Sequence, residues 1–198
     1  PFDAILLGAV GWPATLPDGE TLAPLVKMRQ SFDQYACVRP TELSPGVRCL
    51  LADKQPGDID LVVIRENSEG EYVDIGGRFR RDTADEHAVQ TAIHSHRGIQ
   101  RVLRYGFELA RTRRRKLTMI TKSNALKHAF TLWEDVLAEV AADFPDVEAE
   151  RQHCDAAAMN LVRQPESFDV IVASNLFGDL LTDLAGAVGG GLGLSPSA

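Results

Sequence analysis

Short apolar runs that alternate with helical patterns restrict this chain to one class of fold. Four of the runs predict buried strands, at Ala4–Leu7, Asp60–Ile64, Leu117–Thr121 and Asp169–Ala173. Each is bounded by polar residues or glycine, as is typical of strands that are covered on both faces. The alternation predicts an α/β protein with a parallel or mixed sheet flanked by helices.

Helical periodicity fills the spaces between these runs. It predicts helices at Leu22–Tyr35, Ser95–Arg111, Ala125–Ala142, Ala156–Arg163 and Phe177–Ala187. A more alternating run at Val147–Gln152 predicts a further strand. Within residues 71–94, Gly76 and Gly77 lie between two possible strands, which predicts a hairpin or an arm. Pro24 is expected to end or restart a turn of the first helix.

The composition excludes some kinds of partner. The 198 residues carry a formal net charge of −7, which argues against nucleic acid as the main partner. The basic residues Arg111 and Arg113–Lys116 are expected to form a solvated helix end. Cys37, Cys49 and Cys154 form no close pair, which favours a reducing cytoplasm without disulfides. We expect no membrane partner, because no apolar run is long enough to span a bilayer.

The two ends of the sequence predict that it is part of a longer protein. It opens inside an apolar run without a methionine and stops at Ser195–Ala198, directly after a glycine-rich stretch. We therefore expect the chain to be a fragment, or the ordered part of a longer chain.

An acidic pair follows the last predicted strand. A helix is expected to start near Asn175, and ligands of open α/β sheets gather at such carboxyl ends of strands. Asp179 and Asp183 are four residues apart, so they lie on one face of that helix. Paired carboxylates suit Mg²⁺ or Mn²⁺. Spacing alone also fits an acidic first helical turn, favoured by the helix dipole, with Asp183 solvated.

Three arginines lie beside the ends of predicted elements. They are Arg29, Arg39 and Arg65, of which Arg65 directly follows a buried strand. A guanidinium binds a carboxylate through two parallel hydrogen bonds, so several arginines suit a substrate with more than one carboxylate. Without further information, three unrelated surface arginines are the preferred interpretation. Lys122, after another strand, and Tyr72 could act as acid or base, or simply as a surface cation and a half-buried aromatic.

The segment Asn175-Leu-Phe-Gly-Asp179-Leu-Leu-Thr-Asp183, with the glycine-rich run that ends at Ala198, closely resembles the signature of the β-decarboxylating dehydrogenases. That family includes isocitrate, isopropylmalate, D-malate and tartrate dehydrogenases. Residues 29–40 and 65–72 resemble its substrate-binding segments. Residues 32–35, 56–60 and 69–72 look most like the tartrate/D-malate branch, whereas residues 21–24 depart from that branch's bulkier pattern.

The resemblance implies a metal site that two subunits share. Asp179 and Asp183 would bind Mg²⁺ or Mn²⁺, and the facing subunit would supply Asp155 as a third ligand. From its position alone, Asp155 is an acidic residue at a helix start, where capping is the default role. The same resemblance implies that Arg29, Arg39 and Arg65 hold the substrate carboxylates.

The resemblance also implies the remaining roles. Lys122, given by the neighbouring subunit, would help to remove the proton of the substrate hydroxyl. Tyr72 would return a proton to the enol left after CO₂ departs, and Asn124 would lie near the nicotinamide ribose of NAD. The segment that binds the adenosine half of NAD is expected outside this sequence.

The expected fold is therefore isopropylmalate dehydrogenase-like, with two subdomains. Residues 1–36 and 174–198 would belong to the cofactor-side subdomain, and residues 37–173 to a second one with the dimer interface and an arm at about 71–94. The expected activity is metal-dependent, NAD-linked oxidative decarboxylation of D-malate or tartrate by a homodimer. The alternatives are isopropylmalate as substrate, a non-catalytic regulatory relative, or a fragment that only binds a partner chain through the arm.

Overall fold

The computed structural model describes residues 6, 8, 14–15 and 18–197. The chain divides into two compact units, Pro1–Gln34 and Tyr35–Ala198, and each is described by itself. The strand expected at Ala4–Leu7 lies outside the described residues, apart from Leu6. The predicted subdomain boundaries stay a prediction.

Helix α1 (Asp18–Ser31) is the regular element of the first unit, and Arg29 lies in its last turn. The helix begins and ends four residues earlier than the predicted Leu22–Tyr35. It ends where Asp33 takes a left-handed conformation with a φ of 48°. The helix continues through Pro24, so the expectation that this proline would interrupt it is wrong.

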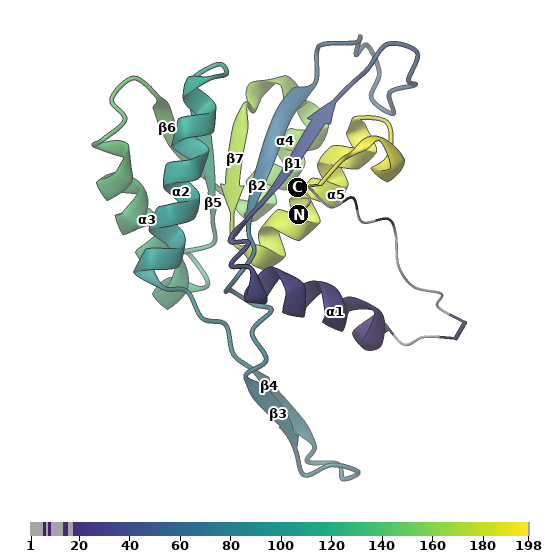
Figure 1. The fold of residues 1–198 in the computed structure, drawn as a ribbon, viewed down its shortest axis with the longest axis vertical. Helices are drawn as coiled ribbons and strands as arrows, with labels where there is room; N and C mark the ends of the chain where they lie inside the picture. The colour runs from purple at the N-terminus through teal and green to yellow at the C-terminus, as the bar shows by residue number, and fades with distance from the viewer. Residues whose placement is uncertain (1–5, 7, 9–13, 16–17, 198) are drawn as a thin grey trace, which may run out of the picture. The chain divides into compact units, whose positions relative to one another are not determined.

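The second unit is built on a five-stranded sheet with the order β1-β2-β7-β5-β6 (Figure 1). The strands are β1 (Ala36–Glu42), β2 (Asp60–Glu66), β5 (Lys116–Thr121), β6 (Glu148–His153) and β7 (Val170–Ala173). Strands β2, β7, β5 and β6 run parallel, and β1 pairs with β2 in the antiparallel direction. The prediction of an α/β protein with a mixed sheet is confirmed.

Strand β1 is the element that the sequence pattern missed. It contains Arg39 and Pro40, and it lies at the edge of the sheet beside β2. A proline cannot donate to a strand ladder, so prolines in sheets are confined mainly to edges. Because polar residues and a proline interrupt it, the strand does not form an apolar run in the sequence, although Cys37 and Thr41 are buried.

Helices cover both faces of the sheet (Figure 1). Helices α2 (His96–Arg111) and α3 (Lys127–Ala141) pack on one face, and α4 (Cys154–Arg163) and α5 (Asn175–Val188) on the other. Two short 3₁₀ helices, η1 (Pro165–Ser167) and η2 (Leu192–Leu194), complete the elements. None of the described helices has the length and apolar character that a membrane span requires.

Side chains along the central strands alternate between the two faces of the sheet, so each strand contributes to both hydrophobic cores. Ile64 and Val172 face α2 and α3, where Trp133 is fully buried, whereas Val63 and Ile171 face α4 and α5. Each fully buried apolar side chain of this size contributes roughly 1.5–3 kcal/mol relative to leaving it in water. Burial on both faces explains why the central strands read as continuous apolar runs.

Strands β3 (Gly76–Phe79) and β4 (His87–Gln90) form a separate antiparallel ribbon that extends away from the sheet (Figure 1). The predicted hairpin is confirmed, but its glycines do not form the turn. Gly76 and Gly77 lie inside β3, and residues 80–86 make the connection. A Cβ atom on Gly76 would overlap the carbonyl oxygen of Val89, so glycine allows the two strands to approach.

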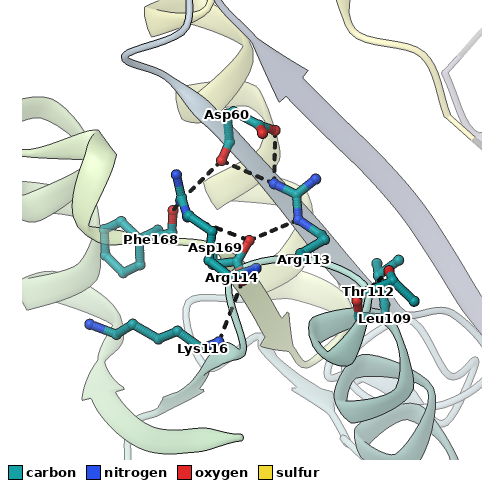
Figure 2. Close-up of polar contacts among 8 residues, drawn as sticks. All are labelled: Asp60, Leu109, Thr112, Arg113, Arg114, Lys116, Phe168 and Asp169. Atoms are coloured by element: carbon teal, nitrogen blue, oxygen red, sulfur yellow. Dashed lines mark hydrogen bonds and ion pairs between the residues drawn. The ribbon is translucent and has the colours of Figure 1, made fainter.

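A buried ion network joins the amino ends of the parallel strands (Figure 2). Asp169, which is 1% exposed, accepts hydrogen bonds from Arg113 Nε and the Arg114 backbone N–H, both at 2.8 Å. Arg113 Nη2 also donates to Asp60 Oδ1 at 2.8 Å. The network therefore links the turn before β5 to the starts of β7 and β2. The expectation of a solvated helix end is wrong for Arg113, which is paired with two carboxylates.

We predict that Asp169→Ala strongly destabilises the chain. It leaves the Arg113 guanidinium and the Arg114 N–H without their buried acceptor, a class of change that costs roughly 3–5 kcal/mol. Asp146→Ala is the matched control, because Asp146 holds Arg111 of the same region at an exposed position. Urea unfolding should give a large loss of stability for the first variant and a small one for the second. Equal losses would contradict the structural role of the network.

Candidate functional site

The candidate site lies at the carboxyl ends of the parallel strands, opposite the Asp169 network. Strand β2 ends at Arg65 and Glu66, and β7 ends at Ala173, one residue before the N-cap of α5. The two strands pair with Arg65 opposite Ala173. This register places Arg65 beside the first turns of α5, although the two segments are far apart in sequence.

Three of the predicted residues converge on the carboxylate of a fourth, Asp179. Arg65 Nη1 donates to Asp179 Oδ1, and Arg39 Nη1 lies 3.6 Å from the same oxygen. The Tyr72 hydroxyl donates to Asp179 Oδ2 at 3.0 Å. Arg39 reaches the site from β1, whose ladder places Cys37 opposite Arg65. The antiparallel edge strand is therefore what brings the second arginine to the site.

The cluster carries an excess of positive charge in a largely buried place. Arg65 is 5% exposed, and its pKa is lowered, first by burial and also by the neighbouring Arg39. The Nε atom of Arg39 is buried and has no hydrogen-bond partner among the described residues. Two guanidiniums share one carboxylate, and a buried donor remains unsatisfied. These features favour binding of a further anion such as a carboxylate.

The hydroxyl of Tyr72 is held as a hydrogen-bond donor. Its ring lies beneath the Arg65 guanidinium, with the Cζ atom 5.1 Å from the ring centroid. Burial raises the pKa of Tyr72 above the ordinary 10.0, and the hydrogen bond to the Asp179 carboxylate raises it further. The hydroxyl is therefore protonated throughout the neutral range and points at the same carboxylate as the arginines.

Two further residues shape this cluster and were missed by the sequence analysis. Asn175 accepts a hydrogen bond from Arg65 Nε at 2.8 Å. Glu71 accepts from the Ser174 hydroxyl and the Leu176 backbone N–H, both at 3.0 Å, so it caps the start of α5. Asn175 could have been found from its spacing, because it lies one helical turn before Asp179 on the same face. Glu71 gives no comparable signal, because its partners are distant in sequence.

A second group lies at the ends of β5 and β6. Lys122 Nζ donates to Asp155 Oδ1 at 2.6 Å, and this hydrogen bond lowers the pKa of Asp155. The Asp155 side chain is 70% exposed, whereas that of Lys122 is 27% exposed. Asp155 lies in the first turn of α4, two residues after the N-cap His153. Asn124 is exposed in the turn that follows β5.

The two groups remain separate within one chain. Among the described residues, no hydrogen bond or ion pair joins Asp155 to Asp179, and no three metal-binding side chains gather at one place. Asp183 is exposed, one turn beyond Asp179. These two carboxylates offer the hard oxygen donors that Mg²⁺ and Mn²⁺ prefer. Asp179 and Asp183 fit such an ion as part of its ligand set. A further carboxylate would have to come from outside the Asp179 group. Arg29 belongs to the first unit.

The sequence and the fold are similar to those of known proteins. Residues 2–198 match the family described as isocitrate/isopropylmalate dehydrogenase. The chain is 51% identical to a decarboxylating D-malate dehydrogenase of Escherichia coli (strain K12), covering 100% of this chain and 55% of that protein. It is 47% identical to a tartrate dehydrogenase/decarboxylase of Pseudomonas putida, again covering 100% of this chain and 55% of the relative. Both relatives fit the branch predicted from the sequence.

A solved structure shares the fold. The isocitrate dehydrogenase from Methylococcus capsulatus matches with a TM-score of 0.81 and 38% identity, covering 87% of this chain and 50% of that one. The chain thus spans about half the length of the curated relatives it matches. The profile match over nearly all residues and the identities near one half agree with the motif at Asn175–Asp183. The chain belongs to the isocitrate/isopropylmalate dehydrogenase family.

Proposed function

We propose that the protein containing this chain catalyses metal-dependent, NAD-linked oxidative decarboxylation of a small 2-hydroxy dicarboxylic acid, D-malate or tartrate. The observation that carries the proposal is the convergence of Arg39 and Arg65 on Asp179, with a buried Arg39 donor left unpaired. That arrangement favours an anionic substrate. The D-malate and tartrate activities named for the two relatives support the choice of substrate.

Substrate binding is assigned to the arginines. Arg65 projects from the end of β2 and Arg39 from β1, so one rigid antiparallel pair supports both guanidiniums. Guanidiniums on a rigid scaffold hold carboxylates in a defined orientation, which is worth much of the rate gain in reactions of small acids. Arg29, in the last turn of α1, is proposed as a third carboxylate ligand.

The metal site is assigned to Asp179 and Asp183 of one chain and Asp155 of a second copy. Mg²⁺ or Mn²⁺ held there would act as a Lewis acid toward the keto acid that hydride transfer produces. Of the two ion-paired carboxylates, Asp155 is more exposed than Asp179, so it is available to another molecule. The third carboxylate is assigned to a second copy, because no group of three metal-binding side chains gathers among the described residues of one chain.

A homodimer with shared sites follows from that assignment. Large apolar side chains are exposed on the β3–β4 arm, namely Phe79 and Val89, and on the neighbouring helices α4 and α5, namely Met159 and Leu180. Exposed apolar side chains on a projecting ribbon and a helix pair favour burial against another copy. The same contact would bring the Lys122–Asp155 group of one chain to the Asp179 group of the other.

Proton transfer is assigned to Lys122 and Tyr72. Lys122 would take the hydroxyl proton of the substrate during oxidation, the role that the family resemblance implies for it. Tyr72 would donate a proton to the enol carbon after CO₂ leaves. Its raised pKa keeps the proton on the hydroxyl until it is needed. Asn124 is proposed to contact the ribose next to the nicotinamide.

The activity is tested with purified full-length protein. We expect NAD⁺ reduction with D-malate or tartrate in the presence of Mn²⁺ or Mg²⁺, and none after chelation with EDTA. Asp183→Asn should abolish the activity, because it removes a proposed metal ligand. The variant should still fold, because Asp183 is exposed. Absence of turnover with D-malate, tartrate and isopropylmalate under these conditions would refute the proposed reaction.

Subunit sharing is tested by complementation. Lys122→Ala and Asp183→Asn should each be inactive as pure dimers. After mixing and exchange of subunits, about half of the dimers are mixed, and each mixed dimer holds one intact site. The mixture should therefore recover about a quarter of the wild-type activity. A mixture that stays inactive, although mass spectrometry detects mixed dimers, would place both residues in one chain's site.

Tyr72→Phe tests the acid assignment. The variant keeps the ring beneath Arg65 and loses only the hydroxyl, so we expect kcat to fall by about 10²–10⁴-fold with little change in KM. The raised pKa of Tyr72 means that the acid form persists to higher pH than in an ordinary tyrosine, so the residue should cause no loss of rate in the neutral range. Tyr105→Phe on α2 is the matched control. Equal kinetics of the two variants would exclude Tyr72 as the acid.

A further inference from the structure

The side chain of Asn175 links the predicted substrate arginine to the loop that follows it. Its Oδ1 atom accepts from Arg65 Nε at 2.8 Å, and its Nδ2 atom donates to the Glu69 carbonyl at 2.9 Å. The residue is 4% exposed and lies in the first turn of α5. One buried amide therefore contacts both the end of β2 and the loop that leads to Tyr72.

The chemistry of its partners fixes the orientation of this amide. Arg65 Nε can only donate a hydrogen bond, and the Glu69 carbonyl can only accept one. The oxygen of Asn175 must therefore face Arg65 and its nitrogen must face Glu69. An aspartate of the same shape would lose the donor to Glu69, and alanine would lose both contacts.

Close packing leaves Arg65 little freedom to move away from this amide. A Cβ atom on Gly178 would lie 2.7 Å from the Cβ atom of Arg65, so the arginine stem passes directly over that glycine. A Cβ atom on Gly70, whose φ is +82°, would lie 3.0 Å from the Cβ atom of Asn175. Glycine at both positions allows the loop and the arginine to approach the helix.

We infer that Asn175 is a positioning residue, which sets the rotation of the Arg65 guanidinium and fixes the loop that carries Tyr72. The inference rests on the proposed function, in which Arg65 binds a substrate carboxylate. The Asn175 contact uses Nε of the guanidinium, whereas Asp179 uses Nη1. The orientation of Arg65 is therefore retained when the Asp179 carboxylate also serves another ligand.

Glu71 strengthens the same attachment from the loop side. Its carboxylate bonds to Ser174 and to the Leu176 N–H, so two consecutive regions of the loop are bound to the start of α5. Among the described residues, no hydrogen bond or ion pair joins Glu71 to Arg39 or Arg65, so Glu71 acts on the loop and the start of α5. Asn175 alone reaches both the loop backbone and the guanidinium among the described residues of this segment.

The test compares Asn175→Ala with Gln100→Ala in the full-length protein. Gln100 also forms an amide hydrogen bond between two elements, from α2 to Glu139 of α3 at 2.8 Å. We expect Asn175→Ala to raise the KM for the hydroxy acid about tenfold, as for loss of a hydrogen bond to a charged group, with a smaller change in kcat. Gln100→Ala should leave both constants unchanged.

A double-mutant cycle separates positioning from general destabilisation. In an Arg65→Lys background there is no Nε–H to orient, so Asn175→Ala should cause no further increase in KM. The inference is overturned if Asn175→Ala leaves the KM unchanged in the wild-type background. It is also overturned if the KM rises by the same factor in the Arg65→Lys background.

Hydrogen exchange tests whether Asn175 fixes the loop that carries Tyr72, and this test does not depend on catalytic activity. Backbone amides of residues 66–72 should exchange several-fold faster in Asn175→Ala than in the wild type, and at unchanged rates in Gln100→Ala. A protein without dehydrogenase activity would refute the proposed function, and the exchange rates would still test the loop attachment. Unchanged exchange in Asn175→Ala would overturn it.

Discussion

Asp169 fixes the relation between three parallel strands through one buried carboxylate. Its partners, Arg113 and the Arg114 N–H, belong to the turn before β5, and Arg113 extends the network to Asp60 at the start of β2. A slip of one residue in any of these strands would break the contacts of the buried Asp169 carboxylate, and it would also move apolar side chains to the wrong face. The strand register at the amino edge is therefore defined electrostatically. Because the strands are short and rigid, the same register determines which side chains meet at the carboxyl edge, where Arg65 lies opposite Ala173.

The cluster around Asp179 inverts the usual charge balance of a buried ion pair. Buried charges in proteins are ordinarily matched one to one, because an unmatched charge is costly in a medium of low polarity. Here Arg39 and Arg65 share the carboxylate of Asp179, and Asn175 occupies one more donor of Arg65. The paired strands β1 and β2 and the capped helix α5 hold these charged side chains in place. Positive charge arranged in this way suits the carboxylate substrate proposed above, since the charges are in place before the substrate arrives.

The sequence predicts those parts that depend on local pattern. The central strands were found because burial on both faces makes them continuous apolar runs, and Asp179 and Asp183 were found because a helix places them on one face. Strand β1 was missed because Arg39 and Pro40 interrupt its pattern, although an edge strand tolerates both. The roles of Glu71 and Arg113 depend on partners 53 to 105 residues away, and no local rule reports such contacts. The family resemblance supplied the residues of the site, but not the contacts that hold them in place.

The separation of the two groups in sequence has a consequence for how the chain folds. Lys122 and Asp155 are 33 residues apart and join adjacent strands, β5 and β6, through one crossover helix. Arg65 and Asp179 are 114 residues apart, and they meet only after β7 has inserted between β2 and β5. Closing the longer loop costs more entropy and contributes to slow folding. The Lys122–Asp155 pair should therefore form early and the cluster of Arg39, Arg65 and Asp179 late, so that a chain still being synthesised contains the first without the second.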